Sequence, residues 1–412
     1  MLSPTSALPA VPVKTINQQS GTPGAWSTSS VRVLHVVPQL AIGGTELTLA
    51  RIVRALSDEQ FSHRVCAMRG CSDRESWNAE LDSDPIVISE QHQRGFRFPV
   101  RQLVKLMREL KPDVVHTRNW GGLEAVLAAR MAGVKAIVHS EHGYDPSMLG
   151  GLPLRRRVFR RGMYSIVDRL LAVTSELADY HAAQGWVSRK KFQVIHNGID
   201  TDHLQPSAAR RATARREFGI GSNDVVLGWM GRMAPIKDVP TLLRAAASLA
   251  KRHPQLRVLL VGSGSEEQRW RSGAQGHSEL NGRVVFTGER RDVGEVLSAM
   301  DVFVLPSVRE GMSNTLLEAM ALELPVIATA AGGNSEVVED RVSGFLFKPG
   351  DNLALANLLE PLIVNSELRA RMGEAARRRA ETHFSLRRMT SNYAQLYLEV
   401  AQKRPETTYV RN

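Results

Sequence analysis

Short apolar runs alternate with longer helical patterns along most of this chain. Runs that are apolar throughout, such as DVVHT at 113–117 and RLLAVT at 169–174, suit strands covered on both faces of a sheet. Strands that alternate with helices predict a parallel, doubly wound α/β domain. The first series of predicted strands comprises residues 31–37, 63–68, 85–89, 113–117, 136–139, 169–174 and 192–196.

The alternation restarts after a polar, Arg/Ala-rich connection at 205–223. Two consecutive series predict two Rossmann-like, doubly wound domains facing a cleft, and they argue against a single barrel of eight strands because more strands are predicted. We place the domains at 31–205 and 206–384, after a disordered leader at 1–30. The second series of predicted strands comprises residues 224–231, 257–262, 284–288, 301–306 and 325–329. Helices follow, and the chain closes with the segment 385–412. The last helix, at 385–402 in this segment, should pack back on the first domain.

Composition narrows the class of protein. Of 412 residues, 43% are hydrophobic, which excludes a mostly disordered chain, and no run approaches the ~18 apolar residues of a membrane-spanning helix. The two cysteines, Cys66 and Cys71, fit no zinc pattern and are expected to be reduced thiols. The leader lacks the features of a signal peptide. We therefore expect a cytoplasmic protein.

The net charge of +11 leaves three kinds of anionic partner open: nucleic acid, a membrane surface or a small substrate. Binding of nucleic acid would call for basic residues interleaved with aromatic ones, but only 6% of residues are aromatic and no such stretch occurs. We therefore expect no nucleic-acid partner.

Loops that follow strands are the expected ligand sites of parallel sheets. Gly43 and Gly44 follow the first strand, where paired glycines and a helix start let backbone amides approach an anion. Arg232 and Lys237 follow the first strand of the second series, and together they can neutralise a diphosphate. His142, at the end of another strand, is a candidate for a polar contact to substrate.

The segment 301–320 is a strand, a loop and a helix that carry two glutamates. Ser313 is the predicted N-cap of a helix at 314–322, whose free amides form an anion site. Glu318 could accept both hydroxyls of a ribose, and Glu310 could meet sugar hydroxyls. The alternatives are a capping role for Glu310 and a solvated helix face for Glu318.

These motifs, in this order, resemble those of the GT4 family of retaining glycosyltransferases, which have the GT-B fold. The motifs are Gly43-Gly44, Glu141-His142-Gly143, Gly231-Arg232 with Lys237, and Glu310 separated by seven residues from Glu318. The stretches 196–206 and 325–351 are also similar to that family, and the likeness spans about 31–383. A closer likeness is to sugar transferases of bacterial exopolysaccharide and PEP-CTERM systems.

The resemblance implies a role for each motif. Arg232 and Lys237 would hold the nucleotide diphosphate as leaving group, Glu318 would bind the ribose, and His142 would contact the sugar. Stabilisation of the departing diphosphate would be the main catalytic contribution, with no metal or other cofactor. The remaining implied contacts are Glu310 with the amides of Gly311, Met312, Ser313, Asn314 and Thr315 for the transferred sugar, Gly43 and Gly44 for the phosphate or acceptor, and Gly264, Thr287, Gly288 and Glu289 near the base.

The implied activity is transfer of a sugar from a UDP- or GDP-sugar to a glycan or lipid-linked acceptor. A metal-dependent GT-A enzyme would need a D-x-D motif, and the two matches, at 82–84 and 200–202, are better interpreted as turns. A nucleotide-sugar epimerase and a non-catalytic nucleotide-sugar-binding protein are further alternatives, although every motif position carries the expected residue.

A basic segment at 154–167 bears on the acceptor. Its apolar residues Phe159, Met163, Ile166 and Val167 share a helical stripe. The segment is either a core-packed helix with an arginine-rich exposed end or a helix peripheral on the inner face of the cell membrane. The arginines of this segment, which would meet an anionic membrane surface, are Arg155, Arg156, Arg157, Arg160 and Arg161. A smaller mixed patch in the same half comprises Arg94, Phe96, Arg97 and Phe98.

Overall fold

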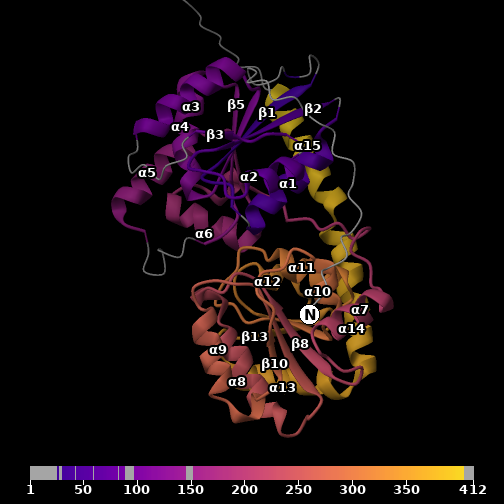
Figure 1. The fold of residues 1–412 in the computed structure, drawn as a ribbon. Coiled ribbons are helices and arrows are strands. Elements are labelled where there is room, and N and C mark those ends of the chain that lie inside the picture. The colour runs from indigo at the N-terminus through magenta and orange to yellow at the C-terminus, as the bar shows by residue number, and fades with distance from the viewer. Residues whose placement is uncertain are drawn as a thin grey trace, which may run out of the picture.

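The chain folds into two halves, each a parallel sheet with helices on both faces (Figure 1). The computed structural model describes residues 26, 30–41, 43–58, 60–81, 83–88, 97–144 and 152–402, with the backbone alone for 97–99. The predicted leader lies outside these residues except for Ser30 and Trp26, whose indole N–H donates to the carbonyl of Leu110 at 2.7 Å. The patch at 94–98 also lies outside them, apart from the backbone of 97 and 98.

The N-terminal half contains a seven-stranded sheet in the order β3-β2-β1-β4-β5-β6-β7. The central β1 pairs with β2 on one side and with β4 on the other, and His35 of β1 lies opposite Val65 and His116. The strands are β1 Val31–Val37, β2 Phe61–Ala67, β3 Ile86–Val87, β4 Val114–Arg118, β5 Ala136–Glu141, β6 Arg169–Ala172 and β7 Phe192–Val194. The helices are α1 Gly44–Leu56, α2 Arg74–Leu81, α3 Arg97–Leu110, α4 Leu123–Ala132, α5 Leu154–Ser165 and α6 Ser175–Gly185.

The C-terminal half contains a six-stranded sheet in the order β10-β9-β8-β11-β12-β13. Its strands are β8 Val225–Met230, β9 Leu256–Val261, β10 Val284–Phe286, β11 Val302–Leu305, β12 Val326–Thr329 and β13 Gly344–Phe347. Its helices are α7 Ala208–Glu217, α8 Val239–Ala250, α9 Glu267–Gln275, α10 Val293–Ser298, α11 Asn314–Ala321, α12 Asn334–Val337, α13 Asn352–Val364 and α14 Ser366–His383. The edge strand β13 was not predicted, because its run GFLF begins with a glycine, a residue that weakens the pattern typical of a strand.

The connection at 205–223, expected to be polar, contains the packed helix α7. Arg215 of this helix is buried, and it pairs with Asp301, just before β11, at 2.6 Å. Arg211 pairs with the same carboxylate at 2.5 Å. These two arginines therefore fasten the helix to the second sheet, which is why an arginine-rich segment forms part of the fold.

The last helix, α15 (Leu386–Gln402), returns from the C-terminal half to the first sheet (Figure 1). Tyr393, Leu396 and Tyr397 are buried in one apolar cluster with Val33 and Val114 of that sheet. Helix α15 therefore packs on the sheet of the N-terminal half. The chain therefore passes between the halves twice, and the two passages touch, since the Leu386 amide donates to the carbonyl of Ile199 at 2.8 Å.

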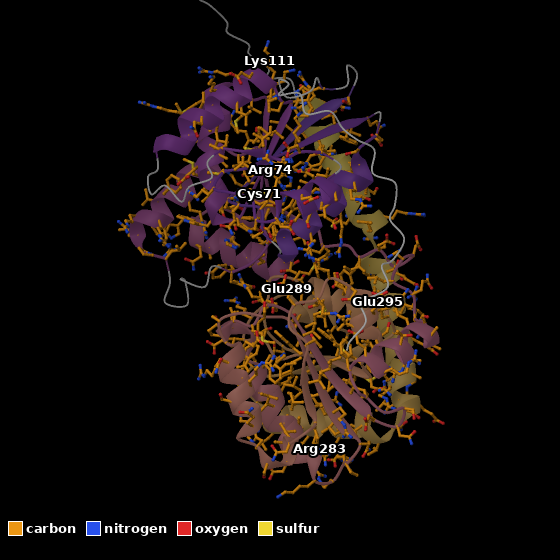
Figure 2. The ribbon with its side chains drawn as sticks, in the orientation of Figure 1. Cys71, Arg74, Lys111, Arg283, Glu289 and Glu295 are labelled. Carbon is orange, nitrogen blue, oxygen red and sulfur yellow. The ribbon has the colours of Figure 1, made fainter. Side chains whose placement is uncertain are left out.

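The carboxyl ends of both sheets face each other. Arg283 precedes β10 and Glu289 follows it, and Figure 2 shows Arg283 at the far end of the C-terminal half and Glu289 beside the N-terminal half. Lys111, which precedes β4, lies at the opposite extreme of the molecule. The loops after the strands of both sheets therefore meet at the interface between the halves, as expected for ligand sites in parallel sheets. Within the described ranges, no helix is both long and apolar enough to cross a bilayer.

Candidate active site between the two halves

The loops of the two halves touch through their backbones. A Cβ added to Gly311, in the loop after β11, would lie 2.3 Å from the carbonyl oxygen of His142, just after β5. A Cβ on Gly333 would lie 2.0 Å from the oxygen of Gly311, in the same half, and 2.5 Å from the methyl group of Thr174, in the N-terminal half. Such distances leave no room for a side chain. The glycines of the predicted motifs therefore allow the loops of one half to approach those of the other closely.

Lys237 and Glu310 form an ion pair across two loops of the C-terminal half. The 3₁₀ helix η4 (Pro235–Lys237) follows β8, and Glu310 follows β11. The Lys237 Nζ lies 2.6 Å from the Glu310 Oε1, and the side chains are 21% and 13% exposed. The Val308 amide donates to the Ile236 carbonyl at 2.8 Å and holds the two loops together.

Arg232 lies on the same loop as Lys237 and is exposed. No described residue forms an ion pair or hydrogen bond with its guanidinium. The structure therefore places one paired and one unpaired cation at the carboxyl end of β8, where an anionic group would meet both.

Glu318 lies in the second turn of α11 and is 4% exposed. The helix begins as predicted, because the Ser313 side chain accepts a hydrogen bond from the Leu316 amide at 3.3 Å. Glu318 does not lie on a solvated helix face. Its Oε1 accepts a hydrogen bond from Nη2 of Arg51, in α1 of the other half, at 2.7 Å. Sequence patterns do not reveal this partner, since 267 positions separate the two residues.

Asn314, one turn before Glu318, joins three segments. Its Nδ2 donates to the Gly44 carbonyl and to Oγ1 of Thr48, each at 3.0 Å, and its Oδ1 accepts from Nδ2 of Asn197 at 2.9 Å. Asn197 also donates its backbone amide to Sδ of Met312 at 3.2 Å. Asn197 was not predicted as a site residue, although it follows a predicted strand.

His142 is buried and neutral. Burial, reinforced by the charge of Arg118, lowers its pKa to about 3. Its Nε2 lies 2.9 Å from Oγ of Ser140, its backbone amide donates to Oδ1 of Asn119, and its Nδ1 is buried without a hydrogen-bond partner. The imidazole can therefore contact a substrate as a neutral donor or acceptor.

The neighbouring Glu141 is a charged group inside the N-terminal half. Tyr164 donates to its Oε1 at 2.6 Å. Burial alone would raise the pKa of Glu141, but His181, His139 and Arg160 together hold it well below its ordinary value. The carboxylate thus joins α5, through Tyr164, and α6, through His181, to the end of β5, next to His142 in the chain.

The loops expected near the base lie side by side. The Gly262 amide donates to the Gly288 carbonyl at 2.8 Å, and Oγ of Ser263 lies 3.5 Å from Oε2 of the exposed Glu289. Gly264 has φ of +151°, and a Cβ there would lie 2.3 Å from the oxygen of Met233, which follows Arg232. The remaining predicted residues are Thr287, whose hydroxyl donates to the Gly288 carbonyl at 2.9 Å, and Thr315, whose Oγ1 lies 3.0 Å from that of Ser313.

One arginine of the basic segment was wrongly assigned to the surface. Arg160 is fully buried, with Nη1 3.0 Å from Nδ1 of His181 and with its guanidinium 5.0 Å from the centre of the Trp120 ring. It faces inward because it balances the charge of Glu141. The apolar stripe of this segment packs against the core too, as Phe159 and Met163 do.

The structure offers no metal site among the described residues, which contain no group of three or more His, Cys, Asp or Glu side chains able to hold an ion. Asp84 pairs with Arg74 at 2.9 Å, and Asp200 accepts the backbone amide of His203 at 3.0 Å, as in a turn. Residue 82 lies outside the described ranges. Cys66 and Cys71 are free thiols.

Comparison with known proteins identifies the family. Residues 42–203 match the family described as Glycosyltransferase Family 4, and residues 210–379 match the one described as Glycosyl transferases group 1. The relative EpsD of Bacillus subtilis is 32% identical over 309 residues, which cover 72% of this chain and 79% of EpsD. This chain is a family 4 glycosyltransferase.

Two further likenesses are informative. A galactosyltransferase of Escherichia coli, named as transferring from UDP-Gal to α-D-GlcNAc-diphosphoundecaprenol, is 27% identical over 72% of this chain and 78% of its own length. The crystal structure of Anabaena HepE in complex with UDP superimposes with a TM-score of 0.76, at 23% identity, over 89% of this chain and all of HepE. That structural likeness establishes the fold of the glycosyltransferase as GT-B, with two Rossmann-like halves.

Proposed function

We propose that this glycosyltransferase moves a sugar, with retention of configuration, from a nucleotide-diphosphate sugar to a glycan or lipid-linked acceptor without a metal ion. The observation that carries the proposal is the group of Arg232, Lys237 and Glu310 at the carboxyl ends of β8 and β11. It supplies two cations for a diphosphate and one carboxylate for sugar hydroxyls, at the place where the other half closes over them.

The chemistry follows from these charges. The bond between the anomeric carbon and the diphosphate breaks, and its electron pair leaves with the diphosphate, whose growing charge Arg232 and Lys237 neutralise. The acceptor hydroxyl forms the new bond on the face that the diphosphate vacates, and its proton passes to a departing phosphate oxygen. An ammonium group has three donors, so Lys237 can remain bound to Glu310 while it donates to the diphosphate.

The test combines a screen of nucleotide sugars with two variants. Transfer by the wild-type enzyme should persist in EDTA, and NMR of the product should show the anomeric configuration of the donor. Lys237→Ala and Glu310→Ala should each abolish transfer while circular dichroism remains that of the wild type. The matched controls are Lys251→Ala and Glu279→Ala, which break an ion pair of 3.3 Å elsewhere in this half. Full activity in either site variant, or strict dependence on manganese, would overturn the assignment.

The donor and acceptor are proposed from the relatives. HepE is described as a complex with UDP, and the E. coli relative is named for a UDP-sugar and a diphosphoundecaprenol acceptor. Both names favour a UDP-sugar as donor here, and the name of the E. coli relative also favours a polyprenyl diphosphate-linked acceptor. The likeness of the sequence motifs to sugar transferases of bacterial exopolysaccharide systems favours a role in exopolysaccharide synthesis, and we propose that the enzyme acts there from the cytoplasm.

A lipid-linked acceptor implies contact with an anionic membrane, and helix α5 supports it. Leu154 and Val158 are 67% and 56% exposed, one turn apart, and Arg155 and Arg161 are exposed beside them. Apolar side chains flanked by arginines suit the surface of an anionic bilayer. Arg157 instead stacks on Trp186, with its guanidinium carbon 4.3 Å from the centre of the ring, so its charge is held against the protein.

Vesicles test this surface. Vesicles that contain phosphatidylglycerol should retain the wild-type enzyme at low salt and release it at high salt. A Val158→Asn, Arg161→Glu variant should bind much less, whereas Lys105→Glu on α3, which is 80% exposed, should bind as the wild type does. Equal binding by all three proteins would exclude α5 as the contact.

A further inference from the structure

Glu318, the residue proposed to bind the ribose, has a partner from the other half of the molecule. Gly44, Thr48 and Arg51 are spaced by four and three residues on α1, so they lie on one face of that helix. Gly44 and Thr48 accept hydrogen bonds from Asn314, and Arg51 donates to Glu318, one turn further along α11. This face of α1 therefore lies against the helix that presents the ribose carboxylate.

The pair of Arg51 and Glu318 is incomplete. The Glu318 side chain is 6% exposed, and its Oε1 accepts from Nη2 of Arg51, whereas no described residue donates to its Oε2. Nη1 of Arg51 is buried and has no hydrogen-bond partner. A buried donor left unsatisfied is costly, and such a group in a native structure calls for an explanation. One acceptor of Glu318 and one donor of Arg51 thus take no part in the hydrogen bonds of this ion pair.

We infer that Arg51 is a nucleotide-binding residue supplied by the N-terminal half. The Oε2 of Glu318 accepts one ribose hydroxyl, and the free Nη1 of Arg51 donates to an oxygen of the same ribose. The inference rests on the proposed function, and on the role that the family resemblance implies for Glu318, which is to bind the ribose. Because Arg51 comes from α1, a bound ribose joins the two halves, and nucleotide binding favours the closed arrangement.

Titration calorimetry with UDP and GDP, and with their 2′,3′-dideoxy forms, tests the inference. Arg51→Ala should weaken binding of the nucleotide that the wild type prefers about 10- to 100-fold, the range of a charge-assisted hydrogen bond. The dideoxy form should bind the variant and the wild type equally, since it lacks the oxygens in question. Arg54→Ala is the matched control, because Arg54 lies one turn along α1, is 64% exposed and pairs with Glu80 at 3.6 Å.

A purely structural role for Arg51 predicts a different result. If Arg51 only packed α1 against α11, its loss would weaken binding of the ribonucleotide and of the dideoxynucleotide by the same factor, and that result would overturn the inference. If Arg51 only positioned Glu318, the lysine variant would keep that role, so wild-type binding of the ribonucleotide by Arg51→Lys would also overturn it. Arg51→Lys keeps the charge beside Glu318 but lacks the second N–H, so it should melt as the wild type does and still bind the ribonucleotide less tightly. Binding of the ribonucleotide by Arg51→Ala at wild-type strength would overturn the inference alone. A wild type that binds neither nucleotide would overturn the proposed function and the inference with it.

Discussion

At the scale of single residues, the buried histidines make the fold sensitive to mild acid. Burial lowers the pKa of His63 to about 4 and that of His142 to about 3. An unfolded histidine has a pKa of about 6.5, so below that pH the unfolded chain binds protons that the folded chain does not. Each of these residues should therefore reduce stability by about 1.4 kcal/mol per pH unit as the pH falls from about 6 towards 4.

Urea unfolding at a series of pH values between about 7 and 5 measures this slope. His63→Phe should make the slope shallower, by about 1.4 kcal/mol per pH unit, because one titrating group is lost. His203→Gln, at an exposed position, should leave it unchanged. A wild-type stability that does not vary over this pH range would contradict the assignment of neutral, buried imidazoles.

Residue types predict local contacts well and distant ones poorly. The cap at Ser313 was predicted because its partner amide lies three positions away. Arg51 was not, because its partner lies in the other half. Arg160 was misplaced for a related reason: in a run of arginines the one that faces Glu141 cannot be told from its neighbours by spacing alone.

At the scale of elements, α15 completes the core of the N-terminal half. Tyr397 is fully buried, and its hydroxyl lies 2.8 Å from Nδ1 of His116 in β4. Tyr397→Ala should reduce the free energy of unfolding by about 3–5 kcal/mol, the cost of removing a large buried ring. Tyr397→Phe should cost about 1 kcal/mol, the worth of one hydrogen bond.

Urea unfolding of the two variants checks these values. The control is Gln395→Ala, on the exposed face of the same helix, which should stay within about 0.5 kcal/mol of the wild type. Losses of equal size for the alanine and phenylalanine variants would show that the ring does not pack as described.

The alternation of apolar runs and helices predicted most strands because a strand buried on both faces is apolar throughout. It predicted neither β13 nor α7. The sequence of β13 (GFLF) is brief, and it approaches β12 so closely that a Cβ on Gly344 would lie 2.2 Å from the Val326 oxygen. Helix α7 is stabilised by ion pairs to Asp301, which a local hydrophobic pattern does not reveal.

At the scale of the whole molecule, the two halves are joined by polar contacts on several sides of the site. Arg309, next to Glu310, pairs with Glu176 of α6 at 2.8 Å, with its guanidinium 3.9 Å from the centre of the Tyr144 ring. Arg291 pairs with Asp73 at 2.7 Å on an exposed edge. The sequence predicted two facing domains, but not which residues join them, since each pair unites segments that are far apart in the chain.

Glu336 makes a further contact between the halves, through both of its carboxylate oxygens. Its two carboxylate oxygens accept the backbone amides of Ser175 and Glu176, each at 3.0 Å, at the first turn of α6 in the other half. His196 lies 3.3 Å from the same carboxylate. Burial alone would raise the pKa of Glu336, but His196 and the two amides hold it at about 2. A negative charge at a helix N-terminus is favourable, so the ionised carboxylate draws the halves together.

Glu336→Gln should therefore loosen the halves without unfolding either of them. The amide side chain has lost the charge and can accept from the helix with one oxygen only. We expect the radius of gyration from small-angle X-ray scattering to increase relative to the wild type, and nucleotide to reverse the increase, because the donor site lies between the same loops. Glu339→Gln is the control, since that side chain is 55% exposed and, among the residues that the structure describes, pairs with Arg379 alone, at 3.4 Å. Scattering from Glu336→Gln that matches the wild type, with and without nucleotide, would mean that the remaining contacts close the enzyme by themselves.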